Sequence, residues 1–108
     1  MNELPDHRSI AIVLVEDDAD LREEIAEVLA ERGFDVRSFP GSRELYRALM
    51  LRPCDIAILD IGLPGEDGLS IMEHLRLSTH AGIIMLTARG QTEDRVRALR
   101  GGADLYLV

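Results

Sequence analysis

Hydrophobic and polar residues form blocks along the chain, and the spacing of the apolar residues changes from block to block. Continuous apolar runs rich in β-branched residues occur at residues 10–15, 56–59 and 83–86, with weaker strand candidates at 35–39 and 104–108. A continuous apolar run is typical of a strand covered on both faces. Between these runs apolar residues recur with helical spacing. The pattern predicts alternating strands and helices that end in a fifth strand.

The predicted helices each have one apolar face. These faces carry Leu21, Ile25, Val28 and Leu29, then Leu45, Ala48 and Leu49, then Leu69, Met72 and Leu75, and finally Val96 and Leu99. Strands that alternate with helices favour a parallel sheet with right-handed crossovers and helices on both faces. The predicted fold class is therefore α/β, a doubly wound parallel sheet. Functional sites of such sheets lie outside the carboxyl ends of the strands.

Capping residues mark where the predicted helices begin and end. Asp20 and Glu23 have the spacing of a capping pair at the start of the first helix. Ser42 is the predicted N-cap of the second helix. Gly33 is predicted to end the first helix in a left-handed conformation, and the glycine pair at 101–102 is predicted to close the fourth helix.

Length and composition limit the class of protein. A chain of 108 residues with 46% hydrophobic residues predicts one soluble globular domain and excludes a disordered acidic tail. The net charge of -8 argues against binding of nucleic acid by this segment. No apolar run is long enough to span a membrane. We expect a polar tail at residues 1–8, without a secretory signal, a domain at 9–108, and a cytoplasmic location.

The cysteine and the histidines do not indicate a second catalytic or metal site. Cys54 is the one cysteine, so an intramolecular disulfide is excluded, and we expect it to be a small buried apolar residue. His7, His74 and His80 have no acidic or nucleophilic partner by spacing and are expected to be solvated. All 12 basic residues are arginine, so no lysine ammonium is available for catalysis.

Acidic residues follow the predicted strands at their carboxyl ends. Glu16, Asp17 and Asp18 follow the first strand, Asp60 ends the third, and Thr87 ends the fourth. Carboxylates brought together at one edge repel each other, and a hard cation such as Mg²⁺ resolves the conflict with oxygen ligands. The sequence therefore predicts a metal site at this edge.

A carboxylate beside such a metal is a competent nucleophile toward phosphorus. Asp60 is the candidate, with the Thr87 hydroxyl and the backbone N–H of Ala88 as donors to a phosphoryl oxygen. Taken singly, these residues have simpler interpretations: the acidic run caps a helix, Asp60 is a turn residue and Thr87 an ordinary strand residue. Their joint placement at three strand ends favours the functional interpretation.

These residues resemble the receiver domain of two-component response regulators over nearly the whole chain. The first strand and acidic residues at 12–18 match that family, as do a phosphoacceptor loop at 58–65 and Gly68. Residues 85–89 and 102–106 are similar to the family's fourth and fifth strands. The resemblance implies a flavodoxin-like sheet of five parallel strands in the order 2-1-3-4-5.

The resemblance also implies roles for individual residues. Asp60 would accept a phosphoryl group from the phosphohistidine of a sensor histidine kinase or a histidine phosphotransfer protein. Asp17 would bind Mg²⁺ directly and Glu16 through water, with Asp60 and the backbone carbonyl of Gly62 completing the protein ligands. Thr87 and Tyr106 would form a switch pair that reshapes the face of the fourth helix and fifth strand. Asp18 would be a helix cap.

The chain departs from the family at its end. Receivers have a lysine after the fifth strand, then a proline and a fifth helix, whereas this sequence stops at Val108. We therefore expect a shortened receiver that lacks its last helix, and in which phosphotransfer to the chain is slow or the switch is poorly coupled to phosphorylation. The resemblance implies an output module beyond Val108, such as a DNA-binding domain. Dimers would form through the fourth helix and fifth strand, or through surface left uncovered beside the first helix.

Two other functions stay open. A receiver-like scaffold that binds partners without phosphorylation would explain the absence of lysine, although it has no need for Glu16, Asp17, Asp60 and Thr87 together. A hydrolase with an aspartate nucleophile usually has a second aspartate two residues later, where this chain has Gly62. The expected class is a phosphoacceptor signalling domain and not an enzyme.

Overall fold

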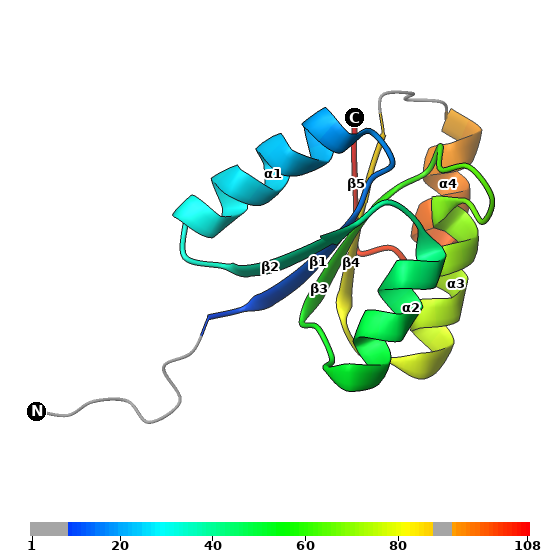
Figure 1. Ribbon diagram of the computed structural model, residues 1–108. Coiled ribbons are helices and arrows are strands. Elements are labelled where there is room, and N and C mark those ends of the chain that lie inside the picture. The colour runs from blue at the N-terminus through cyan, green and yellow to red at the C-terminus, as the bar shows by residue number, and fades with distance from the viewer. Residues whose placement is uncertain (1–8, 88–91) are drawn as a thin grey trace, which may run out of the picture.

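The computed structural model describes residues 9–87 and 92–108, and in these residues strands and helices alternate strictly (Figure 1). The strands are β1 (Ala11–Val15), β2 (Asp35–Phe39), β3 (Ile56–Asp60), β4 (Gly82–Leu86) and β5 (Leu105–Leu107); the helices are α1 (Ala19–Glu31), α2 (Ser42–Leu51), α3 (Gly68–Ser78) and α4 (Thr92–Gly101). The predicted alternation is confirmed. Both the expected polar tail at 1–8 and Ala88 lie outside the described residues.

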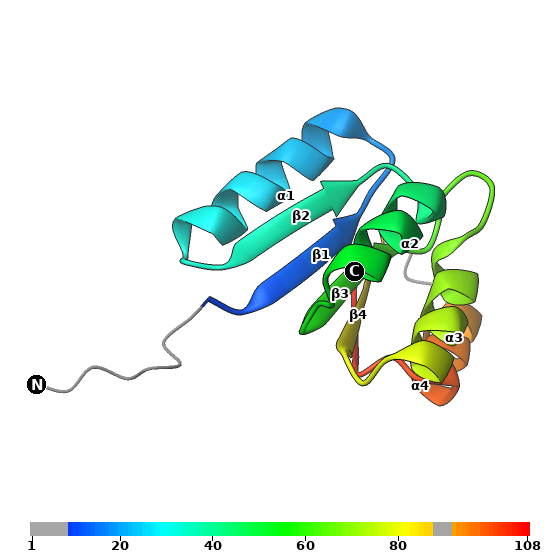
Figure 2. The same cartoon turned by 60° about the horizontal axis from the view of Figure 1, so that its bottom comes forward.

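The strands form one parallel sheet in the order β2-β1-β3-β4-β5. This confirms the predicted doubly wound architecture. The chain passes from β1 outward to β2, and then returns across β1 to β3 on its other side. Figure 2 shows β1 and β2 as parallel arrows. The reversal between β1 and β3 is the switch point at which ligands of such sheets bind.

Helices cover the two faces of the sheet unequally. α1 lies on one face, whereas α2, α3 and α4 lie on the other (Figure 1). Side chains alternate between the faces of a strand, so Val13 and Val15 of β1 enter the larger core while Ile12 and Leu14 enter the smaller one below α1. The larger core is completed by Ala57, Leu59, Ile83 and Met85 from the strands and by Leu45, Leu69, Ile71, Met72, Leu75 and Ala98 from the helices.

Two of the predicted helix starts are wrong. Asp18, and not the pair formed by Asp20 and Glu23, caps α1, because its side chain accepts hydrogen bonds from backbone N–H groups of the first turn. The N-cap of α2 is Gly41, and Ser42 is the first helical residue. The cap that the family resemblance implied for Asp18 is therefore confirmed.

The predicted helix ends are confirmed by backbone geometry. Gly33 follows α1 with φ of 96°, and Gly102 follows α4 with φ of 126°. Both values lie in the region that L side chains avoid, so glycine allows the chain to turn there. Across the described helices, none combines the length and hydropathy that a membrane crossing requires.

Candidate functional site

The carboxyl ends of β1, β3 and β4 meet at one edge of the sheet. β1 and β3 are paired up to their ends, and Asp60 pairs with Leu86 of β4. Glu16 therefore follows β1 beside Asp60, the last residue of β3, and Thr87 follows β4 directly. The sequence prediction that these three strand ends lie together is confirmed by the register.

Three carboxylates gather at this edge. Oxygen atoms of Glu16, Asp17 and Asp60 lie within 4.8 Å of one another, and no other cluster of potential metal ligands occurs in the described part of the chain. Glu16 is only 6% exposed, Asp60 is half-buried and Asp17 is exposed. A set of oxygen donors fits a hard divalent cation, which would neutralise charges that otherwise repel one another.

The pKa of Glu16 is raised by its position in the cluster. Burial raises the pKa of its carboxyl above the ordinary value, and the charges of Asp60 and Asp17 raise it further. A hydrogen bond acts in the opposite direction, because the backbone N–H of Asp18 donates to Oε2 of Glu16 at 3.0 Å. The Glu16 carboxyl is therefore oriented by the bond from Asp18, but its ionised form is disfavoured unless a positive charge lies nearby.

Arg22 holds the backbone of the acidic segment. Its Nη1 donates to the carbonyl oxygen of Glu16 at 2.8 Å from the first turns of α1. Because Asp18 caps the same helix, the residues between β1 and α1 are fixed from both sides. Sequence reasoning missed Arg22, although its position six residues after Glu16 is within reach of the strand end.

A shallow hollow of about 380 Å³ leads from the acidic edge to α1. Its lining consists of Glu16, Asp18, Leu21, Ile25, Asp60, Leu86 and Thr87. The acidic residues and Thr87 supply the polar part of this lining, and Leu21, Ile25 and Leu86 supply the apolar part. A small reagent can therefore approach Asp60 from solvent through this hollow.

The loop after β3 fixes the position of the Asp60 side chain. The backbone N–H of Gly62 donates to Oδ1 of Asp60 at 3.3 Å, and the side chains of Ile61 and Leu63 are buried. Gly68 donates from its N–H to the carbonyl oxygen of Ile61 at 3.2 Å. A side chain at Gly68 would collide with the backbone carbonyl of Asp60, so this close approach requires glycine.

Of the predicted switch residues, Thr87 directly follows β4 and Tyr106 lies in the neighbouring strand β5. Thr87 is 6% exposed, and its N–H donates to the carbonyl oxygen of Leu107 at 3.1 Å. Tyr106 pairs with Met85 and packs, half-buried, against the larger core. The guanidinium carbon of Arg95 from α4 lies 6.0 Å from the centre of the Tyr106 ring. Tyr106 therefore lies beside α4.

The remaining predicted site residues have different outcomes. Gly62 is exposed on the loop after Asp60, and the metal-binding role of its carbonyl stays a prediction. The backbone N–H of Ala88 lies outside the described residues, so its role also stays a prediction.

The prediction that His74 has no partner is wrong. Although its side chain is 60% exposed, Nδ1 of His74 lies 2.7 Å from Oε2 of Glu66 and 2.9 Å from the hydroxyl of Tyr46. Ser70 and His74 lie one turn apart on α3, and Glu66 precedes Ser70 by four residues; this spacing is a signal that sequence reasoning could have used. Tyr46 is distant in sequence and gave no such signal.

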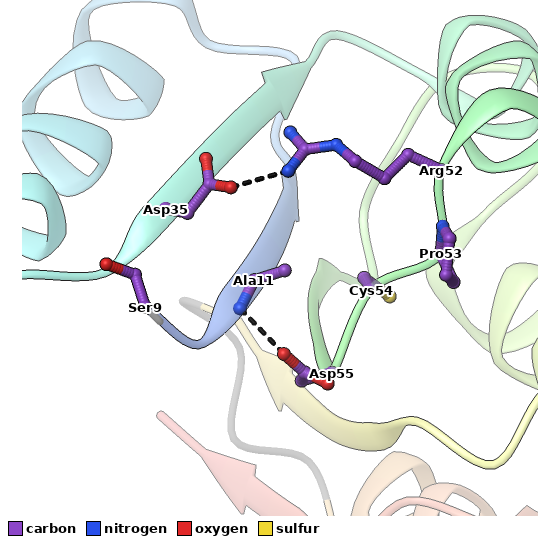
Figure 3. Close-up of a pocket in the computed structure, with 7 residues that line it drawn as sticks. All are labelled: Ser9, Ala11, Asp35, Arg52, Pro53, Cys54 and Asp55. Carbon is purple, nitrogen blue, oxygen red and sulfur yellow. Dashed lines mark hydrogen bonds and ion pairs between the residues drawn. The ribbon is translucent and has the colours of Figure 1, made fainter. Parts of the chain in front are cut away.

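A larger hollow, of about 530 Å³, lies at the opposite end of the sheet (Figure 3). Its lining consists of Ser9, Ala11, Asp35, Arg52, Pro53, Cys54 and Asp55. Its polar groups bind one another: Arg52 donates to Asp35 at 2.6 Å, and the N–H of Ala11 donates to Asp55 at 2.8 Å. Burial raises the pKa of the Cys54 thiol, which makes it a poor nucleophile. The acidic edge is therefore the better candidate for chemistry.

Comparison with known proteins identifies the family of the chain. The family model of the response regulator receiver domain matches residues 12–108. The chain therefore belongs to the response regulator receiver family. The transcriptional regulatory protein GltR of Pseudomonas aeruginosa is 44% identical over 101 residues, which cover 90% of this chain and 41% of that protein. The chain thus spans less than half the length of this relative.

Solved receiver structures share the fold. The BeF3-activated receiver domain of Klebsiella pneumoniae RstA superposes with a TM-score of 0.85 at 31% identity, covering 90% of this chain and 83% of that one. A response regulator from Burkholderia pseudomallei, solved with a phosphorylated aspartic acid, a calcium ion and citrate, has a TM-score of 0.86 at 25% identity. That match covers 92% of this chain and 59% of the other.

Proposed function

We propose that this chain is a signalling receiver that accepts a phosphoryl group on Asp60 in a reaction that requires Mg²⁺. The observation that carries the proposal is the cluster of Glu16, Asp17 and Asp60 at adjacent strand ends, in a chain of the receiver family. The Burkholderia neighbour, with its phosphorylated aspartic acid and calcium ion, supports the same chemistry.

The donor set fits the cation. Asp17 would bind Mg²⁺ directly and Glu16 through water, while Asp60 and the carbonyl of Gly62 complete the protein ligands. The spacing of the three carboxylates and the raised pKa of Glu16 both favour a bound positive charge. The cation would neutralise the carboxylates and the incoming phosphoryl oxygens.

Asp60 acts as the nucleophile in the proposed transfer. One of its carboxylate oxygens attacks the phosphorus of a phosphohistidine, so that an O–P bond forms while the P–N bond breaks. The imidazole leaves with the electron pair of the broken bond and takes up a proton from solvent. The hollow beside Asp60 leaves room for the donor to approach.

The phosphoryl group would then change the strand ends. It adds about −1.5 to −2 charge and three acceptor oxygens. The Thr87 hydroxyl and the N–H of Ala88 donate to these oxygens, and Tyr106 follows Thr87 inward. This movement reshapes the surface of α4 and β5, which an output module or a second copy of the chain reads.

The proposed partners follow from this chemistry. The donor is a sensor histidine kinase or a histidine phosphotransfer protein. The receiver comprises residues 9–108 after a polar tail, and its output is DNA binding by a further domain, as the name of the transcriptional relative GltR suggests. The chain is a phosphoacceptor and not an enzyme that acts on a separate metabolite.

Intact-protein mass after incubation with acetyl phosphate tests the proposal. The chain is compared with Asp60→Asn and with Asp20→Asn, a matched change at an exposed carboxylate on α1. We expect one phosphoryl group on the chain and on Asp20→Asn with Mg²⁺, and none on Asp60→Asn or in EDTA. Equal gain by Asp60→Asn would overturn the assignment. No gain by any form would favour a scaffold that works without phosphate.

A further inference from the structure

Glu66 lies in the loop between β3 and α3 and turns back toward two helices. The loop begins at Asp60, where β3 is paired with β4, and ends at Asp67, whose side chain caps α3 through the N–H of Ser70 at 2.9 Å. Between them, Gly65 has φ of 76° and reverses the chain. Both ends of the loop are thus anchored, and Glu66, directly before the cap Asp67, is placed to tie the α3 end of the loop to the helices beside it.

The Glu66 carboxylate links its loop to α2 and α3 through three side-chain groups. Oε1 accepts from the hydroxyl of Tyr46 on α2 at 3.0 Å, and Oε2 accepts from the hydroxyl of Ser70 on α3 at 2.6 Å. Nδ1 of His74, one turn further along α3, lies 2.7 Å from Oε2. The rings of Tyr46 and His74 meet edge to face, 5.7 Å apart. We call these four residues the Glu66 clamp.

The charge state of Glu66 suits this role. Burial raises the pKa of its carboxyl, but hydrogen bonds from Ser70, Ser42, Tyr46 and His74 outweigh that effect and lower it below the ordinary value. Glu66 is therefore ionised at neutral pH and accepts all of these bonds. Because a carboxylate can only accept, Nδ1 of His74 must carry a proton to satisfy its contact.

We propose that Glu66 is a positioning residue of the Asp60 loop. The clamp fixes the loop in the shape that presents Asp60 and the carbonyl of Gly62 to a divalent cation, and it does so from outside the metal site. The inference rests on the proposed function, since it assigns the clamp a role in the same reaction. The physical reason is preorganisation: a loop already held in the binding shape loses less entropy when the cation binds.

Removal of the Tyr46 hydroxyl is the sharpest perturbation. Tyr46→Phe keeps the ring that packs against the core and deletes one bond to the carboxylate. We expect amide hydrogens of the loop over 61–66 to exchange faster in the metal-free protein, while those of β1 and β3 stay protected. We also expect the Mg²⁺ concentration for half-maximal thermal stabilisation to rise roughly three- to ten-fold.

Further variants separate positioning from folding. Glu66→Ala should produce a larger effect than Tyr46→Phe, and Glu66→Gln should restore part of the loss because its amide oxygen still accepts from Tyr46. His74→Ala should resemble Tyr46→Phe, whereas His80→Ala, a matched change at an exposed histidine outside the clamp, should leave both readouts unchanged.

The outcomes distinguish the clamp from the proposed function. Unchanged loop exchange and Mg²⁺ dependence in Tyr46→Phe, with or without lower overall stability, would overturn the positioning role. If the unaltered chain shows no Mg²⁺ effect at all, the metal in the proposed function fails. In that case faster amide exchange of the loop in Tyr46→Phe than in the unaltered chain would still show that the clamp holds the loop.

Discussion

Neutralising Glu16 should stabilise the metal-free protein, although Glu16 is buried and hydrogen-bonded. In Glu16→Gln the amide oxygen still accepts from the N–H of Asp18, so the principal change is the loss of one negative charge. The raised pKa of Glu16 indicates that its ionised form is disfavoured in the folded state. The substitution therefore removes a repulsive charge while the side chain keeps its size and shape.

The magnitude follows from the spacing of the carboxylates. Two charges 4.8 Å apart, the limit for this cluster, repel by about 1 kcal/mol in bulk water and about 3.5 kcal/mol at an effective dielectric constant near 20. Glu16 faces two such charges. Because Asp17 is exposed to solvent, the total repulsion energy stays near the lower of these two energies. After a weaker bond to Asp18 is subtracted, we expect a gain of roughly 1–3 kcal/mol, or a Tm at least about 4 °C higher.

Thermal unfolding in EDTA, followed by circular dichroism, measures this gain. A carboxyl with a raised folded-state pKa costs stability only when it is ionised, so the gain should be full above that raised pKa and disappear below the pKa of the unfolded chain. Mg²⁺ should stabilise the unaltered chain more than Glu16→Gln. A variant that is no more stable than the parent at neutral pH in EDTA would refute the reasoning.

Three further predictions concern other parts of the chain. Asp18→Ala removes the cap of α1 and should lower the free energy of unfolding by about 1 kcal/mol in urea titrations, whereas an unchanged midpoint would contradict the cap. Arg76 donates to the carbonyl oxygens of Gly102 and Ala81 at 2.7 and 3.0 Å, so Arg76→Ala should cost roughly 2–4 kcal/mol by the same assay; a loss below about 1 kcal/mol would show that solvent replaces these bonds. A lysine added directly after Val108 should speed phosphorylation by acetyl phosphate, measured by intact mass, and an alanine added there should not.

The fold could be predicted from the sequence because the central strands β1 and β3 are buried on both faces, and β4 has the same continuous apolar pattern. Burial demands continuous apolar runs, and these mark β1, β3 and β4 to within one residue. The acidic edge followed from the same reasoning, since parallel strands bring their carboxyl ends together. Glu16, Asp60 and Thr87 could therefore be placed near one another without coordinates.

The choice between neighbouring residues as helix caps and the contacts between residues distant in sequence could not be predicted in this way. Several acidic residues lie near the start of α1, and which of them caps the helix depends on where the chain leaves β1; the spacing of Asp20 and Glu23 predicts a cap at Asp20, whereas Asp18 is the cap. At α2, Gly41 adopts the extended cap conformation and Ser42 enters the helix. The contact between Tyr46 and His74 joins residues 28 positions apart, and it depends on the packing of α2 beside α3.

Reductive trapping of the phosphorylated residue tests the central claim most directly. Borohydride reduces an acyl phosphate to an alcohol, so an aspartate that carried phosphate becomes homoserine and is located by peptide mass. After treatment with acetyl phosphate and Mg²⁺, we expect homoserine at Asp60 and unmodified carboxylates at Asp17 and Asp18. Homoserine at either of those positions, or none anywhere despite a gain in intact mass, would contradict the assignment of Asp60 as the phosphoacceptor.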